Sequence, residues 1–244
     1  MLTELREELI LNYLKQHQFA KLLELSKITG CSESTIRRDL DRLELRGNLI
    51  KIRGGAKIAK SLRDEPDIET KNKVNTDVKA KLGEYAANLV ENGDVIFIDA
   101  GSTTANMVSN LTNKKDILVV TNGIEVASLL SNFKVSTYLL GGMIKSSTKA
   151  ITGFEAIDRI RDFQFNKSFL GINGIDTEKG FTTPDIQEAD IKKQVILQSK
   201  KTFVLADQSK FDEVSFVKVA DAKSLKIITN QTASEYKGMK IMEV

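Results

Sequence analysis

The stretch SESTIRRDL at residues 32–40 predicts a helix with two unlike faces. Ser32 is placed to cap this helix, and Ile36, Leu40 and Leu43 recur at helical spacing, which predicts one buried stripe. The opposite face carries hydroxyl and guanidinium groups, which donate hydrogen bonds to DNA phosphates and base edges. A merely solvated helix face is the alternative for this stretch taken alone. The helix residues that we expect to contact DNA are Ser32, Ser34, Thr35, Arg37, Arg38 and Arg42.

The flanking sequence favours the DNA-binding interpretation. Two short amphipathic helices are expected before this stretch. After it, residues 49–53 alternate apolar and basic side chains, Gly54 and Gly55 form a turn, and residues 56–58 return as a second strand. A basic hairpin after a helix-turn-helix is a wing, so we predict a winged helix-turn-helix domain over residues 1–58. The hairpin residues expected to contact DNA are Lys51, Arg53 and Lys57.

The composition excludes several classes of protein. One cysteine and one histidine among 244 residues allow neither an internal disulfide, nor a Cys/His metal cluster, nor Ser-His-Asp catalysis. The net charge is +3, but residues 1–60 hold 12 Lys and Arg against 8 Asp and Glu, whereas residues 61–244 hold 24 against 25. The positive excess of the first part fits a polyanionic partner. Apolar runs are short and no secretory signal is evident, so we expect a cytoplasmic protein.

A second domain is expected after a connecting segment. Residues 59–76 are polar, contain Pro66 and lack an apolar period, which predicts a linker. From residue 77 to residue 244, helical stretches alternate with short apolar segments, and this alternation predicts an α/β fold with a largely parallel sheet. The strands are expected at 95–98, 117–120, 135–140, 168–172, 203–206 and 227–229.

The carboxyl ends of these strands are the expected ligand site, because ligands bind there in open α/β sheets. The first strand is followed by Asp99-Ala100-Gly101-Ser102-Thr103-Thr104, whose glycine and hydroxyls at a helix start are typical of an anion site. This loop is neither a Walker A loop nor a dinucleotide fingerprint, and an ordinary helix cap is the alternative. Glu188 and Lys192, spaced i and i+4, are expected to form a plain helical ion pair. Polar residues or glycines that follow the other strands, where plain turns are the alternative, are Asn122, Gly141, Gly142, Gly171, Asn173, Asp207 and Lys210.

The sequence resembles the DeoR family of bacterial transcriptional regulators over residues 2–230. The segments that carry this resemblance are 32–40, 53–56, 99–104, 121–122, 141–142, 153, 171–176 and 207–211, with Arg53 in place of the usual histidine. The resemblance implies a C-terminal sensor domain, similar to ribose-5-phosphate isomerase, that binds phosphorylated sugars or polyols. It places Ser102, Thr103 and Thr104 at the phosphate, Asp99, Asp207 and Lys210 at the sugar, and Lys79 as a phosphate or signalling lysine. The effector-binding residues that it implies are Lys79, Asp99, Gly101, Ser102, Thr103, Thr104, Asn122, Gly141, Gly142, Gly171, Asn173, Glu188, Asp207 and Lys210.

A finer similarity concerns the identity of the effector. Residues 180–185, 188–189 and 214–216 resemble the repressors of fructose operons in Gram-positive bacteria, which implies fructose 1-phosphate. We therefore expect a repressor of a sugar operon, without enzymatic activity, cofactor or metal, that forms a homodimer or homotetramer through its sensor domain. One alternative changes the effector to tagatose 6-phosphate or a polyol phosphate. The other is a sugar-phosphate isomerase with a fused DNA-binding module, in which an aspartate or glutamate serves as the base.

Overall fold

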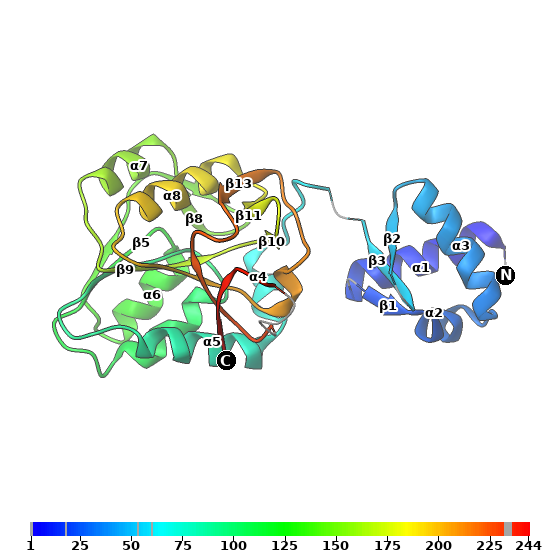
Figure 1. Ribbon diagram of the computed structural model, residues 1–244, viewed down its shortest axis with the longest axis horizontal. Coiled ribbons are helices and arrows are strands. Elements are labelled where there is room, and N and C mark those ends of the chain that lie inside the picture. Colours follow the sequence, from blue (N-terminus) through cyan, green and yellow to red (C-terminus); the bar gives the residue numbers. More distant parts are fainter. Residues whose placement is uncertain (1, 18, 53, 60, 232–235) are drawn as a thin grey trace. The chain divides into compact units, whose positions relative to one another are not determined.

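The computed structural model describes residues 2–17, 19–52, 54–59, 61–231 and 236–244. It divides the chain into two compact units, Met1–Ser61 and Leu62–Val244. Both units have cores of their own, and each is described by itself (Figure 1).

The N-terminal unit is a three-helix winged fold, as predicted. Its core is formed by apolar side chains from all three helices, among them Ile10 of α1, Leu25 of α2 and Ile36 of α3. Ser32 caps α3 as expected, because its side chain accepts a hydrogen bond from the Thr35 amide. The elements of this unit are α1 (Thr3–His17), β1 (Phe19–Lys21), α2 (Leu22–Thr29), α3 (Glu33–Leu45), β2 (Leu49–Ile52) and β3 (Gly55–Ile58).

A third strand, β1, joins the predicted hairpin and was not expected from the sequence. The unit's sheet has the order β1-β3-β2, with antiparallel pairing throughout. Gly55 lies so close to β1 that a Cβ at this position would stand 2.1 Å from the Ala20 carbonyl oxygen. The glycine therefore serves the close approach of β1 to β3 as well as the turn.

The two units meet inside the predicted linker, because the first ends at Ser61 and the second begins at Leu62. The predicted linker, residues 59–76, is mostly part of the second unit, which begins at Leu62 and contains the short helix α4 (Ile68–Asn72). Ile68 is buried, and its amide donates to the Ser147 carbonyl at 2.8 Å. The polar composition of this segment does not prevent it from packing on the second unit, because one buried apolar side chain, Ile68, and a few ion pairs hold it there.

The second unit is built on a parallel sheet of seven strands, which confirms the predicted α/β class. Every neighbouring pair in this sheet is parallel, and the order is β15-β14-β12-β9-β4-β5-β6. All six expected strands are present, and β15 was not predicted. The strands are β4 (Val95–Ile98), β5 (Leu118–Thr121), β6 (Thr137–Leu139), β9 (Lys167–Gly171), β12 (Thr202–Leu205), β14 (Lys226–Thr229) and β15 (Lys240–Glu243).

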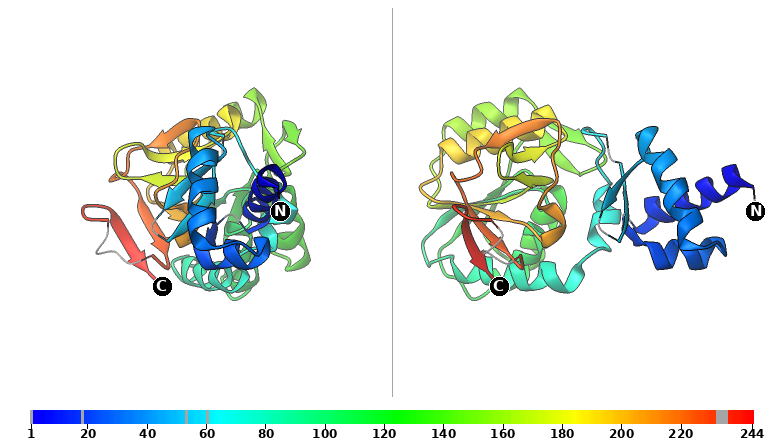
Figure 2. Two further views of the ribbon diagram at one scale, coloured as in Figure 1. Left: turned by 90° about the vertical axis from the view of Figure 1, so that its right-hand side faces the viewer. Right: turned by 45° about the vertical axis from the view of Figure 1, so that its right-hand side comes forward.

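Helices cover both faces of this sheet (Figures 1 and 2). Strand β4 shows how the faces are divided: Ile96 and Ile98 pack with α5 and α6, whereas Phe97 packs with α7 and α8. This alternation follows from the two-residue period of a strand. The helices of this unit other than α4 are α5 (Thr76–Asn88), α6 (Ile124–Asn132), α7 (Phe154–Arg161), α8 (Ile186–Leu197) and the 3-10 helices η1 (Thr104–Leu111) and η2 (Gln208–Lys210).

Two smaller antiparallel sheets complete the unit. The strand order of the first is β10-β11-β13, and the second pairs β7 with β8. No helix within the described residues has the length and apolar character needed to cross a membrane. The strands of the smaller sheets are β7 (Met143–Lys145), β8 (Ala150–Thr152), β10 (Gly174–Asp176), β11 (Gly180–Thr183) and β13 (Val217–Ala220).

Candidate functional site

The exposed face of α3 carries most of the side chains predicted to contact DNA. The Ser32 hydroxyl lies 2.9 Å from the Ser34 hydroxyl and 3.0 Å from that of Thr35, so three hydroxyls gather at the start of the helix. Arg37 and Arg38 are exposed, and Arg37 lies 3.6 Å from Glu33. An exposed pair of this kind is weak, so both guanidinium groups can turn to a polyanion.

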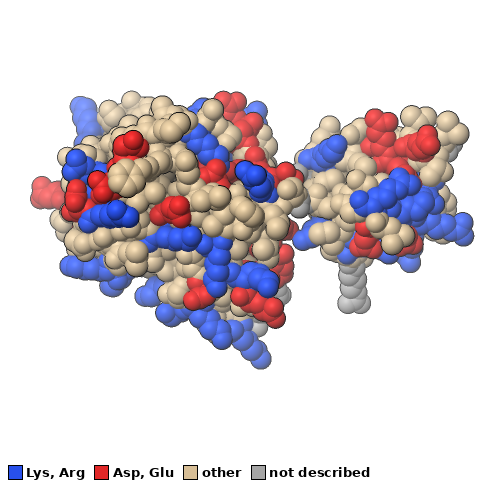
Figure 3. All heavy atoms as spheres, turned by 90° about the horizontal axis from the view of Figure 1, so that it is seen from above, with Lys and Arg blue, Asp and Glu red and all other residues tan. Residues whose placement is uncertain are grey.

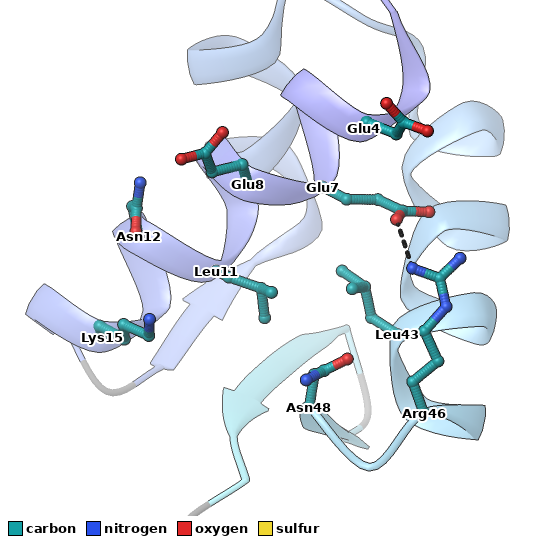
Figure 4. A pocket seen from close by; sticks show the side chains of 9 residues that line it. All are labelled: Glu4, Glu7, Glu8, Leu11, Asn12, Lys15, Leu43, Arg46 and Asn48. Atoms are coloured by element: carbon teal, nitrogen blue, oxygen red, sulfur yellow. Dashed lines mark hydrogen bonds and ion pairs between the residues drawn. The ribbon is translucent and has the colours of Figure 1, made fainter.

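Arg42, also predicted to contact DNA, forms ion pairs with carboxylates of its own unit. Its guanidinium donates to Glu7 at 2.9 Å and also pairs with the fully buried Asp39. Asp39 in turn accepts from Arg6, and Glu7 accepts from Arg46 at 2.9 Å (Figure 4). These residues connect α1 to α3. Arg42 therefore contributes to the packing of the unit, and its contact with DNA stays a prediction, because 40% of its side chain is exposed.

The shallow pocket of Figure 4 lies on the α1 side of this ion-pair network. Glu4, Glu7 and Glu8 contribute three carboxylates to its lining, opposite Arg46 and Asn48. Glu7 is paired with Arg42 and Arg46, and Lys15 adds a further cation, so the lining is of mixed charge.

The hairpin presents a mixture of charges. Lys51 forms ion pairs with Asp41 and Glu44, while Lys57, opposite Ile50 in the register of β2 and β3, is partly exposed. The predicted contact at Arg53 lies outside the described residues. Figure 3 shows basic and acidic side chains intermixed on the visible face of this unit, in keeping with its small positive excess.

In the second unit, the expected ligand site lies where the strand order reverses. Strands β5 and β6 follow on one side of β4, whereas β9, β12, β14 and β15 follow on the other. The crevice at such a switch point is where open α/β sheets bind ligands. Asp99 follows β4 directly and Gly171 ends β9, and the Gly171 amide donates to the Asp99 carboxylate at 3.0 Å.

A buried ion pair between Asp99 and Lys192 forms the centre of this site. Burial lowers the pKa of Lys192, but the charges of Asp99, Glu188 and Glu65 outweigh it and leave that pKa raised. The expected pair between Glu188 and Lys192 is not what the side chains form: Lys192 reaches Asp99, and Glu188 accepts from Thr148 at 2.7 Å. The sequence signal was available, because both residues share the buried face of α8 with Ala189 and Val195.

The loop after β4 is partly committed to its own backbone. The Thr104 hydroxyl donates to the carbonyls of Asp99 and Gly101 at 2.7 and 2.9 Å, so its hydrogen is not available to a ligand. Thr103 precedes η1 without making a side-chain capping bond, which argues against the plain-cap alternative. Asn122, at the end of the neighbouring strand, accepts from the Ala100 amide at 3.0 Å and fixes the loop.

A second group of charges follows β12. Asp207 accepts from the Ser209 amide at 2.8 Å, and although burial raises its pKa, Lys210 and these hydrogen bonds bring it below the ordinary value. Burial lowers the pKa of Lys79 to about 8, and Lys210 and Lys71 add to this effect against the opposing charge of Asp207. Cations crowded around a buried ammonium are suited to receive an anion.

A third cluster contains three residues that the sequence did not single out. Glu65 is buried against Lys71 at 2.7 Å and Lys145 at 2.5 Å. Lys145 also lies 3.1 Å from Glu188, and Asn173 donates to Glu65 at 3.2 Å. These contacts connect the segment after Ser61 to residues that were expected at the ligand site.

Gly141 and Gly142 were predicted at this site, but within the described part of the chain they make no hydrogen bond to its side chains. A Cβ at Gly142 would stand 2.5 Å from the Thr152 carbonyl oxygen, so this glycine serves the packing of β8. The described residues include no group of three or more His, Cys, Asp and Glu side chains arranged to hold a metal ion.

Comparison with known protein families matches both units. Residues 6–62 match the DeoR-like helix-turn-helix domain, and residues 74–231 match the DeoR C terminal sensor domain.

Individual relatives extend over nearly the whole chain. The uncharacterized HTH-type transcriptional regulator FruR of Bacillus subtilis is 44% identical over 94% of this chain and 91% of its own length. The HTH-type transcriptional repressor GlcR of the same organism is 31% identical over 93% of this chain and 88% of its own. Among solved structures, ribose 5-phosphate isomerase A of Methanocaldococcus jannaschii matches 56% of this chain and 55% of its own, with 19% identity and a TM-score of 0.42, a likeness too partial to indicate function.

Proposed function

The chain belongs to the DeoR family of transcriptional regulators, and on that premise we propose that it represses a sugar operon and is released from its operator by a phosphorylated sugar. DNA binding is assigned to the hydroxyls and arginines on the exposed face of α3, with Lys51 and Lys57 of the hairpin at phosphates. One winged module reads a short half-site, so a homodimer or a larger homo-oligomer is proposed as the form that binds DNA.

The observation that carries the effector proposal is the gathering of charged side chains at the carboxyl ends of β4 and β12. A sugar phosphate offers a dianion and several hydroxyls. Lys79 supplies a cation for the anion, the hydroxyls of Ser102 and Thr103 supply hydrogen bonds, and Lys210 stays at the sugar, as the resemblance implies. Carboxylates such as Asp207 accept from sugar hydroxyls. Thr104 is removed from the proposed phosphate ligands, because its hydroxyl is used by the backbone.

Fructose 1-phosphate is the proposed effector. The proposal rests on the resemblance of residues 180–185, 188–189 and 214–216 to repressors of fructose operons. The test is a panel of ligands added to the protein on fluorescently labelled operator selected from random DNA. Release by fructose 1-phosphate, but not by fructose, tagatose 6-phosphate or a polyol phosphate, is expected. Release by another member of the panel would assign that ligand instead.

The same samples distinguish a sensor from an isomerase. A sensor returns the sugar phosphate unchanged, whereas an isomerase converts a ketose phosphate into an aldose phosphate. We expect fructose 1-phosphate to be recovered intact after prolonged incubation with the protein, by phosphorus NMR. Conversion that is proportional to protein concentration would instead support the enzyme.

The variant Thr103→Glu tests the phosphate site directly. Thr103 is buried and makes no capping bond, so a longer acidic side chain should exclude the phosphate by volume and charge. We expect this variant to bind the operator like the parent and to remain bound at every fructose 1-phosphate concentration that releases the parent. Thr112→Glu, on the exposed end of η1, is the matched control and should be released normally. Normal release of Thr103→Glu would refute the phosphate site.

A further inference from the structure

Glu65 is a buried carboxylate in the segment that joins the two units. Only 8% of its side chain is exposed, although its neighbours on either side in the sequence are exposed. Its oxygens contact Lys71 at 2.7 Å, Lys145 at 2.5 Å and Asn173 at 3.2 Å. Glu65 therefore occupies a site formed by two ammonium groups and an amide, which is the donor set of an anion site.

This anion site adjoins the switch-point crevice. Lys145 lies 3.1 Å from Glu188 and 3.3 Å from Asp185, at the start of α8. Glu65 and Glu188 both contribute to the raised pKa of Lys192, the lysine that holds Asp99. Glu65 is thus connected to the effector site by charges, and not only by its place in the chain.

The partners of Glu65 favour exchange with another anion. Lys71 and Lys145 are partly buried, with 20% and 23% of their side chains exposed, so an anion beside them is favoured and can also be reached from solvent. Lysine holds anions as a compact point charge without the fixed fork of arginine, so a phosphate oxygen can replace a carboxylate oxygen with little change of geometry. The neighbouring lysines hold the pKa of Glu65 at about 2 despite its burial, so it competes as an ionised group at physiological pH.

We propose that Lys71 and Lys145 form an anion subsite of the effector site, and that Glu65 is an internal competitor for it. The proposal rests on the function proposed above. The phosphate of the effector reaches these two ammonium groups from the side of Lys79, whose ammonium interacts with that of Lys71, and displaces the Glu65 carboxylate. Because Glu65 lies shortly after Ser61, its displacement alters the packing of the segment between Leu62, whose carbonyl accepts from the Phe216 amide, and Ile68, whose amide donates to the Ser147 carbonyl.

The test measures ligand affinity by calorimetry on the full chain without DNA, with fructose 1-phosphate and with inorganic phosphate in separate titrations. Glu65→Gln removes the competing charge and keeps the side-chain shape, so both ligands should bind about tenfold more tightly. Glu69→Gln is the matched control, because Glu69 lies in the same segment with 72% of its side chain exposed, and the affinity should not change. Lys145→Gln should weaken both ligands about tenfold or more, and Lys145→Arg should restore most of that loss.

The outcomes separate this proposal from the proposed function. Tighter binding by Glu65→Gln together with weaker binding by Lys145→Gln supports the subsite. If the parent binds fructose 1-phosphate and Glu65→Gln binds it equally or more weakly, Glu65 is not a competitor for the subsite, while the proposed sensor function stands. If neither the parent nor Glu65→Gln binds any sugar phosphate of the panel, both are wrong. The titration with inorganic phosphate tests whether the subsite binds the phosphate group or the sugar. If Glu65→Gln gains affinity for fructose 1-phosphate but not for inorganic phosphate, the assignment of the subsite to phosphate is wrong.

Discussion

Raising the pH should weaken effector binding through Lys79. This lysine is buried, and burial together with the positive charges of Lys210 and Lys71 lowers its pKa to about 8, against the opposing charge of Asp207. A phosphate that binds beside the ammonium selects its protonated form and raises its pKa. The affinity for the effector is therefore highest below the pKa of Lys79 and falls as the pH rises through that pKa.

The size of the effect follows from that pKa. With a pKa of about 8, about nine-tenths of the Lys79 side chains are protonated at pH 7 and about one-tenth at pH 9. The phosphate itself is a dianion throughout this range, because its second pKa is about 6. If the complex keeps Lys79 protonated, the dissociation constant for fructose 1-phosphate rises about tenfold from pH 7 to pH 9.

The assay is calorimetry of the full chain at several pH values between these limits. Lys79→Arg keeps its charge over the whole range, so its affinity should be independent of pH. Lys81→Arg, an exposed position on the same helix, is the matched control and should show the same tenfold loss as the parent. A parent affinity that does not change with pH would refute the reasoning, as would an equal loss in Lys79→Arg.

Two further predictions concern the N-terminal unit. Arg37→Ala and Arg38→Ala should each weaken operator binding at matched salt, by about 1–3 kcal/mol where the lost contact was bidentate to a base. Effector affinity, measured by calorimetry, should not change. Unchanged operator affinity in both variants would remove these arginines from the interface. Asp39→Ala should lower the free energy of unfolding of this unit by about 3–5 kcal/mol, because it leaves Arg6 without its buried partner, whereas the exposed Asp41→Ala should lower it by less than about 1 kcal/mol. Amide hydrogen exchange of α3 in the full chain measures this difference, and equal protection in the two variants would contradict it.

The elements that the sequence predicted well are those specified by a local pattern. The stripe of Ile36, Leu40 and Leu43 predicts α3 because a helix buries one face, and apolar runs such as 95–98 predict the parallel strands because those are covered on both faces. Strand β1 was missed because its pattern, Phe19-Ala20-Lys21, is too short to stand out from the helices around it. What makes it a strand is its pairing with β3, a contact distant in the sequence.

The parts of the site that were missed depend on such distant contacts. Glu65 and Lys145 are separated by 80 residues, and Asp99 and Lys192 by 93. No local pattern reveals that one lysine among 36 basic residues is buried against a particular carboxylate. The strand-end rule located Asp99, Asn122 and Asp207, because a parallel sheet brings its carboxyl ends to one edge, but it did not identify the side chains that reach this edge from helices and from the connecting segment.

The segment that the composition predicts as a linker has a direct bearing on induction. An effector changes DNA affinity only if it binds the DNA-competent and the released arrangements with different affinity. The units are joined through Ser61 and Leu62. A change at the effector site that is transmitted along the chain therefore has to reach the residues just after Leu62. Ligand contacts limited to the loops after β4 and β12 reach Glu65 only through the charges around Lys192, whereas the connecting segment is held by the ion pairs of Glu65 itself. A ligand that competes with Glu65 for Lys145 alters the packing of the connecting segment itself, which is why the proposed subsite accounts for transmission as well as for affinity.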